Sequence, residues 1–239
     1  MTDEEKFVED LYEEANEQLK EVYKEQKEIR NELLQEIAMI MLTYTIIDGV
    51  MSISSPNKDS VYKKISKMII IRQQYGSKKE IEILNNILES TVKKTFNFYS
   101  YNADLKDIRK IIESNFKGKH FSQRIWENEN EVTKYLHKQV KNFLNGKINV
   151  NQIKKDIEKT FNTSAYNAKR LVTTEVSRCQ NEAFISFCKE TGVKKIKRNE
   201  TLDSKTCEEC RSFHGKIFDL DKAPGIIHPL CRGFNEVYE

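Results

Sequence analysis

Apolar side chains recur every three or four positions along residues 3–52, and Glu and Lys fill most of the positions between them. This spacing predicts one long amphipathic helix. The apolar stripe consists of Val8, Leu11, Ala15, Leu19, Val22, Ile29, Leu33 and Ile40. Residues 37–47 are apolar nearly all round, which favours burial, and they are fewer than the roughly 20 residues that cross a bilayer. The narrow stripe has two interpretations, which are packing within its own domain and pairing with another subunit.

Further helices are predicted as far as Gly192, with glycines and turn-forming residues at their limits. They cover residues 60–75, 78–99, 103–115, 122–145, 149–161 and 164–191. A break at residues 116–120 separates a helical N-terminal region, residues 1–115, from a helical core, residues 116–192. The N-terminal region is a candidate for docking or oligomerisation.

Beyond Gly192 the pattern changes to short alternating stretches, which predict strands near residues 194–200, 215–219 and 233–238. Residues 193–239 contain too few aliphatic side chains to build a core alone, so a metal ion would supply the missing stability. The expected fold is mainly α, with long N-terminal helices, a helical middle and a small C-terminal zinc-bound module that contains β-strands (α+β).

A cluster of cysteine and histidine residues has the spacing of a zinc site. Two residues separate Cys207 from Cys210, and after 17 more residues His228 and Cys231 repeat this spacing. Two such pairs can converge on one ion and complete a tetrahedral Cys3His site. A closed site leaves no position for substrate water, so one structural zinc ion per chain is predicted. Two alternatives are His214 in place of His228, and free cysteines without a metal.

Several polar residues near the cluster are candidates for supporting it. Asp203 lies four residues before the first cysteine, and it either hydrogen-bonds a ligand from a second shell or is a solvated turn aspartate. The preceding helix carries Arg170, Glu175 and Arg178, and the three-residue spacing of the last two makes an ion pair easy. We expect a structural network that clamps this helix to the zinc module. A catalytic role would need a nucleophile or a metal beside Glu175.

The charges are unevenly distributed along the chain. Residues 1–36 carry 13 acidic and 5 basic side chains, and residues 139–198 carry 13 basic and 5 acidic ones. The basic stretch predicts contact with an anionic partner or with the acidic stretch. Its densest group is the candidate DNA contact, with a solvated face as the alternative: Lys194, Lys195, Lys197 and Arg198. The acidic N-terminus lacks the apolar core of a secretory signal, so we expect a reducing compartment for the five cysteines.

Three motifs follow one another in the second half of the chain. They are FSQRIWENENEV at residues 121–132, AKRLVTTEVSRCQNEA at 168–183, and DSKTCEECRSFHGKIF with HPLCRGF at 203–218 and 228–234. In this order they resemble the phage head morphogenesis, or Mu protein F-like, minor head proteins, from about residue 116 to the C-terminus. One departure is that the family's tail ends Cys-Arg-Cys, whereas this chain has Arg232-Gly233. Gly233 cannot bind a metal, so the last cysteine is dispensable here or does other work.

The resemblance implies a non-enzymatic minor capsid protein that is built into the procapsid near the portal vertex, after assembly in the host cytoplasm. The implied partners are the portal protein, capsid or scaffold proteins, and packaged double-stranded DNA, and no membrane segment is expected. The implied role lies in head morphogenesis, DNA packaging and DNA ejection. The stripe between Val8 and Leu33 is the candidate contact with the particle.

Two enzymatic alternatives belong to other classes of protein. A zinc-containing nuclease of the His-Asn-His type needs a histidine general base and further metal ligands, and only His214 lies near the cluster. An ADP-ribosyl transferase lacks support, because the chain has no compact series of Arg, Ser-Thr-Ser and Glu-x-Glu motifs.

Overall fold

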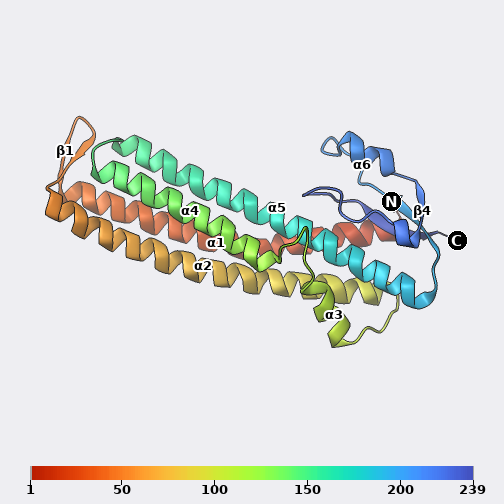
Figure 1. Ribbon diagram of the computed structural model, residues 1–239. Helices are drawn as coiled ribbons and strands as arrows, with labels where there is room; N and C mark the ends of the chain where they lie inside the picture. The colour runs from red at the N-terminus through yellow and green to blue at the C-terminus, as the bar shows by residue number, and fades with distance from the viewer. Residues whose placement is uncertain (1, 239) are drawn as a thin grey trace. The chain divides into compact units, whose positions relative to one another are not determined.

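A computed structural model describes residues 2–238, which are predominantly helical (Figure 1). The helices are α1 (Asp3–Thr43), α2 (Ser55–Phe98), α3 (Leu105–Ile112), α4 (Phe121–Leu144), α5 (Val150–Thr191), α6 (Glu208–Phe213) and the 3-10 helix η1 (Leu220–Lys222). The strands are β1 (Thr45–Ile47), β2 (Val50–Ser52), β3 (Lys195–Asn199), β4 (Ile217–Asp219) and β5 (Phe234–Tyr238). The predicted class, mainly α with a small α+β module at the C-terminus, is confirmed.

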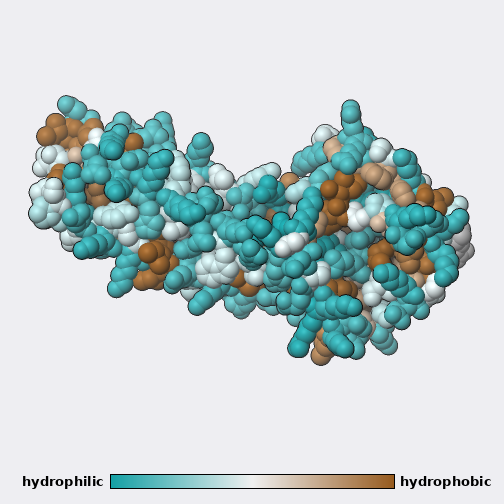
Figure 2. Space-filling model, in the orientation of Figure 1, coloured by the Kyte–Doolittle hydropathy of each residue, from teal (hydrophilic) through white to brown (hydrophobic). Residues whose placement is uncertain are grey.

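The prediction that one helix runs through residue 52 is wrong. Helix α1 ends at Thr43, and β1 pairs with β2 in an antiparallel hairpin whose turn is Asp48-Gly49. Both turn residues have positive φ, 50° and 77°, as a type I′ hairpin turn requires. The end of the apolar run is therefore not buried all round, since Leu42 is 83% exposed. Figure 2 shows hydrophobic residues on the surface near the hairpin, and Met39 and Ile47 are also exposed.

Two other predicted breaks are absent, because α2 passes through Gly76 and α5 passes through residues 162–163. The hydroxyl side chains of Thr163 and Ser164 lie inside α5 and do not cap a new helix. Thr163 Oγ1 donates to the carbonyl of Lys159 at 3.0 Å, and the hydroxyl of Ser164 is buried against Gln26 and Glu129. Hydroxyl side chains inside a helix commonly bond back to the preceding turn.

The chain folds into two compact units, and each is assembled from separate stretches of sequence. Unit 1 contains Met1–Leu19, Glu82–Phe121 and Lys169–Glu239, and unit 2 contains Lys20–Ile81 and Ser122–Ala168. This division differs from the one expected at residues 115/116 and 192/193. The reason is that α1, α2 and α5 are long enough to supply residues to both units.

Unit 2 is a four-helix bundle in which parts of α1, α2, α4 and α5 run side by side (Figure 1). Its core takes residues from all four helices, for example Leu33, Ile65, Phe143 and Ile153. The hairpin closes one end, where the backbone N–H of Val150 donates to the carbonyl of Gly49 at 3.0 Å.

Unit 1 combines helical segments with a three-stranded antiparallel sheet in the order β4-β3-β5. The three strands predicted after Gly192 are thereby confirmed. A small core of Phe184, Cys188 and Ile196 joins α5 to the central strand β3. None of the helices in residues 2–238 combines the length and the apolar character that crossing a bilayer requires.

The N-terminal stripe is buried by the chain itself. Val8, Leu11 and Leu19 are buried within unit 1, and Leu33 and Ile37 within unit 2. Internal packing is therefore the correct interpretation of the stripe. Docking or subunit pairing through these apolar side chains is wrong, because their surface is already used.

Candidate metal centre

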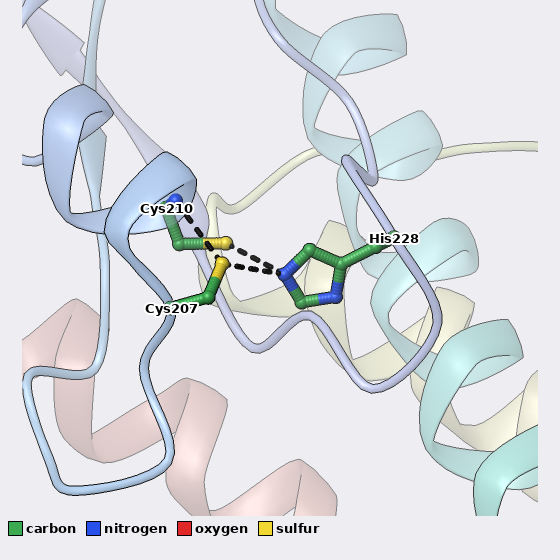
Figure 3. A group of neighbouring side chains, drawn as sticks. All are labelled: Cys207, Cys210 and His228. Atoms are coloured by element: carbon green, nitrogen blue, oxygen red, sulfur yellow. Dashed lines mark hydrogen bonds between the residues drawn. The ribbon is translucent and has the colours of Figure 1, made fainter.

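The first cysteine pair is organised by α6. Cys207 occupies the N-cap position of this helix, with extended backbone angles, and its Sγ accepts a hydrogen bond from the backbone N–H of Cys210 at 3.4 Å. The first helical turn then brings the Cys210 side chain to the same side as Cys207 (Figure 3). The two-residue spacing therefore forms a capped helical turn that presents two sulfur atoms.

The second pair lies in a tight turn, in which the backbone N–H of Cys231 donates to the carbonyl of His228 at 3.1 Å. Leu230 adopts φ 65°, and its backbone N–H is fixed by Thr174 Oγ1 of α5 at 3.2 Å. His228 Nδ1 lies 2.8 Å from the carbonyl of Pro229, which places the proton on Nδ1. The lone pair on Nε2 is then left for a metal ion.

The two pairs converge, as Figure 3 shows for three of the residues. His228 Nε2 lies 3.1 Å from the Sγ atoms of both Cys207 and Cys210. Cys231 Sγ lies 3.9 Å from Cys210 Sγ. Cys210 also belongs, with Cys231 and Glu200, to a second group of ligand atoms within 4.8 Å of one another. The four residues singled out in the sequence thus form one cluster that can hold a metal ion.

The chemistry of this cluster fits zinc. A tetrahedral ion with bonds of about 2.3 Å to sulfur and about 2.0 Å to nitrogen needs ligand separations of roughly 3.5–3.8 Å. The separations of 3.1 and 3.9 Å lie close to this range. Cys231 groups with Cys210 but not with Cys207 and His228, so its side chain would have to move toward these two to complete the site. Thiolate and imidazole donors in a tetrahedral set favour zinc over the harder cations magnesium and calcium.

The protonation equilibria differ among the cluster residues. The hydrogen bond from the backbone N–H of Cys210 lowers the pKa of Cys207, and hydrogen bonds with the neighbouring side chains act in the same direction. Burial raises the pKa of Cys210, and the nearby Cys231 raises it further. The hydrogen bond to the Pro229 carbonyl raises the pKa of His228. Cys207 is therefore better placed than Cys210 to lose its proton as a metal ion enters.

His214 has a different environment from His228. It is exposed, and its Nδ1 accepts a hydrogen bond from the backbone N–H of Glu200 at 3.1 Å. His228, rather than His214, belongs to the group with Cys207 and Cys210. The geometry therefore favours His228 as the fourth ligand.

Asp203 ties the two cysteine pairs together from outside the cluster. Its carboxylate accepts a hydrogen bond from Arg232, next to Cys231, at 2.5 Å, and one from the backbone N–H of Lys205 at 2.9 Å. The contact with Arg232 is the main reason that the pKa of Asp203 falls to about 2. Its carbonyl accepts a further hydrogen bond from Arg211 of α6 at 2.6 Å. Asp203 thus braces the loop before Cys207 through contacts with residues next to the ligands.

The charged network on α5 contacts α3, whereas a contact with the C-terminal module was expected. Arg178 Nε donates to Glu175 at 2.7 Å, and Nη1 and Nη2 donate to the carbonyls of Ile111 and Ile112 at 2.7 and 3.2 Å. Arg178 therefore caps the C-terminus of α3 rather than clamping α5 to the metal module. Arg170 is exposed.

Two uncharged polar residues of α5 connect this helix to the C-terminal module instead. Thr174 accepts from the backbone N–H of Leu230 at 3.2 Å, and Asn181 Oδ1 accepts from Asn235 Nδ2 at 2.7 Å. The expected clamp exists, but uncharged side chains form it.

The candidate DNA contacts divide into three kinds. Lys194 and Lys195 are exposed, and Lys197 is half-buried with its Nζ 2.9 Å from Glu236. Arg198 is 1% exposed. A surface DNA contact through Arg198 is therefore wrong, because its guanidinium lies inside the module and is ion-paired with Glu200 at 2.7 Å.

The position of Glu200 beside Cys210 and Cys231 was not anticipated from the cysteine spacing. A usable signal was the period of two along the predicted strand. Ile196 is apolar and would face inward, so residues 198 and 200 would lie on the same face.

The helices and this cluster define a mainly helical protein with a small C-terminal module whose cysteine and histidine side chains could hold a metal ion. Residues 132–233 match the family model described as Phage Mu protein F like protein. The match confirms the resemblance of this part of the chain to Mu protein F-like phage head proteins that its motifs indicated. The match extends from α4 through α5 and the whole cluster to Gly233. No curated protein and no solved structure matches the chain significantly.

Proposed function

We propose that this protein is a minor head protein that enters the procapsid near the portal vertex. Its role there is structural, in head morphogenesis and in the packaging or delivery of DNA. The observation that carries the proposal is the family match over residues 132–233. The matched segment contains all four candidate metal ligands, so the family feature and the metal centre belong to the same part of the chain.

The proposed metal centre is one structural zinc ion held by Cys207, Cys210, His228 and Cys231. The module around it has only a small apolar core, so an internal cross-link is needed to hold its loops. Structural zinc sites contribute about 10–16 kcal/mol of binding free energy, which is ample for this purpose. The ion would join the turn at α6 to the turn before β5.

The metal centre is tested by elemental analysis of protein that has never met a chelator. We expect about one zinc per chain, with loss of zinc in Cys207→Ser and Cys231→Ser. Circular dichroism of these variants should retain most of the helical signal, because the bundle core of unit 2 contains no cluster residue. The matched pair His228→Ala and His214→Ala identifies the fourth ligand. Loss of zinc only in His214→Ala would show that His228 is not the ligand.

The assignment to the head is tested by purifying particles, blotting for this protein and cross-linking it to the portal. Detection in mature particles, with cross-links to the portal protein, is the expected result. A plasmid-nicking assay with the zinc-loaded chain tests the nuclease alternative. Metal-dependent nicking that is lost in His214→Ala would replace the structural role with an enzymatic one.

A further inference from the structure

Two charged side chains beside the cluster are almost completely buried. Arg198 is 1% exposed and Glu200 is 4% exposed, and together with Ile196 they lie on one face of the chain at and just after β3. Arg198 Nε donates to Glu200 Oε1 at 2.7 Å. Burying a guanidinium is costly unless it is paired and hydrogen-bonded, so this arrangement must be held by its surroundings.

The rest of the Arg198 guanidinium points toward the cluster. Nη2 donates to Cys231 Sγ at 3.4 Å, a normal length for a hydrogen bond to the large sulfur atom. Nη1 donates to the carbonyl of Pro224 at 3.4 Å. Arg198 therefore links one candidate metal ligand to a buried carboxylate, and its planar guanidinium has a fixed orientation between them.

Gly233 provides the space for this ion pair. A Cβ atom at this position would lie 2.2 Å from Arg198 Nη2 and 2.3 Å from both carboxylate oxygens of Glu200. Such distances are far inside van der Waals contact, so any larger residue would displace the pair. Gly233 is not among the glycines with positive φ, which means that space rather than backbone conformation requires glycine here.

We propose that Arg198, fixed by Glu200 in the space left by Gly233, is a positioning residue that donates a hydrogen bond to the Cys231 thiolate of the metal centre. This inference rests on the proposed metal centre. Three thiolates and a neutral imidazole give a zinc site a net charge of −1, which a guanidinium donor helps to stabilise. The hydrogen bond orients Cys231 and withdraws electron density from its sulfur, which lowers the reactivity of the thiolate.

The test uses the full chain loaded with Co²⁺ as a spectroscopic probe. Its readouts are Co²⁺ affinity by chelator competition, the energy of the sulfur-to-cobalt charge-transfer band, and the rate of cysteine alkylation. In Arg198→Met we expect affinity to fall about 10–100-fold, as is typical when an outer partner of a ligand is removed. The charge-transfer band should shift and Cys231 should be alkylated faster. Gly233→Ala should produce the same changes, because it displaces the same donor.

Two variants separate this role from others. Lys197→Met is the matched control, because the lysine is adjacent in sequence but pairs with Glu236 instead, and it should leave all three readouts unchanged. Glu200→Gln should have a small effect, because the amide oxygen can still accept from Arg198. If Arg198→Met does not fold, Arg198→Lys is the variant that tests the inference. We then expect a shift of the charge-transfer band that is smaller than the shift predicted for Arg198→Met.

Three results would overturn the inference. Folded Arg198 variants with a wild-type band and affinity would mean that the buried pair only stabilises the fold. A strong fall in cobalt affinity in Glu200→Gln, with a changed ligand-field spectrum of the cobalt that still binds, would make Glu200 a ligand itself. Failure of the unmodified chain to take up zinc or cobalt would overturn the metal centre and this inference with it.

Discussion

Buried charged side chains are unusual in proteins. In unit 1, buried charged side chains connect segments that are distant in the sequence. Arg178 satisfies the carbonyls at the end of α3 and neutralises the buried Glu175 on its own helix. The last four carbonyls of any helix lack partners within the helix, so a cation at the C-terminus can donate hydrogen bonds to them and interact favourably with the helix dipole. The same side chain also bonds to Ser114 and Glu182, which completes its set of acceptors.

Removing this guanidinium should therefore destabilise the fold strongly. We expect Arg178→Leu to lose about 3–5 kcal/mol of unfolding free energy, because Glu175 would remain buried without a partner. Urea denaturation measures the change. Arg170→Leu, on the same helix but exposed, should change the unfolding free energy by no more than about 0.5 kcal/mol. Equal midpoints for both variants would show that the cap is not needed.

Glu80 is a buried carboxyl group of unit 2. It is 6% exposed, and burial raises its pKa to about 8, with the nearby Glu129 acting in the same direction. The folded state therefore holds a proton that the unfolded state releases near pH 4.5. Unfolding then releases a proton between these two pH values, so stability falls as pH rises through this window.

Glu80→Gln should remove this loss of folding stability at rising pH, because the amide resembles the protonated carboxyl group. At pH 8 the variant should be more stable than the wild type by up to about 5 kcal/mol, at 1.36 kcal/mol per unit of pKa difference. At pH 4 the two should be similar. Urea midpoints at pH 4, 6 and 8 measure the effect, with the exposed Glu131→Gln as a control. Parallel pH profiles for wild type and Glu80→Gln would contradict the prediction.

The four clustered residues could be found from sequence because their spacing is local and their chemistry is specific. Asp203 was found for the same reason, as part of the turn that precedes Cys207. The sequence predicts the wrong environment for Arg198 when the basic residues are treated as one surface patch. In a strand, neighbouring side chains alternate between faces, so Lys197 and Arg198 have opposite environments.

At the level of elements, the type of each segment was easier to predict than its limits. The positions of α4, β3 and β5 follow from periodicity and flanking turns. The lengths of α2 and α5 do not follow from the sequence pattern. Gly76 and the polar residues near 163 are tolerated within these helices, because tertiary packing supports them. The hairpin had a clear signal in Asp48-Gly49, which the apolar run around it obscured.

The turn between α4 and α5 shows where glycine is indispensable to an element. Gly146 has φ 68°, and a Cβ atom there would lie 3.0 Å from Val50 Cγ1 and 3.2 Å from the carbonyl oxygen of Met51. Gly118 has φ 77° but nothing within 4 Å of such an atom. The two positions therefore share the backbone requirement and differ in packing.

Gly118 and Gly146 allow the cost of the left-handed backbone conformation to be separated from the cost of the close packing. Gly118→Ala should cost about 1 kcal/mol, the usual penalty for an L-residue in the left-handed region. Gly146→Ala should cost roughly 1–3 kcal/mol more, because it also presses on the hairpin in the manner of an overpacked core. Thermal or urea denaturation of both variants gives the difference. Equal losses would mean that the hairpin moves aside without resistance.

At the scale of the whole molecule, the apolar stripe of α1 is internal, so contact with other components must use other surfaces. The exposed basic side chains at the start of β3 are candidates for contact with DNA. Lys194 and Lys195 are exposed, whereas Arg198 is buried and Lys197 is paired with Glu236. Only part of the basic stretch seen in the sequence can therefore reach a phosphate.

The structure limits how strongly these residues can contribute to DNA binding. Each neutralised phosphate adds about 0.9 to the slope of log affinity against log salt, so Lys194→Gln with Lys195→Gln should reduce the slope by at most about 2. The affinity should fall similarly for any duplex sequence, because contacts with phosphates do not read bases. Lys197→Gln should have little effect, since that lysine is already engaged by a carboxylate. Fluorescence anisotropy with two unrelated duplexes over a range of salt concentrations measures all three variants. An unchanged slope in the double variant would place the DNA contact elsewhere, and no binding at physiological salt would make this basic surface a solvated face.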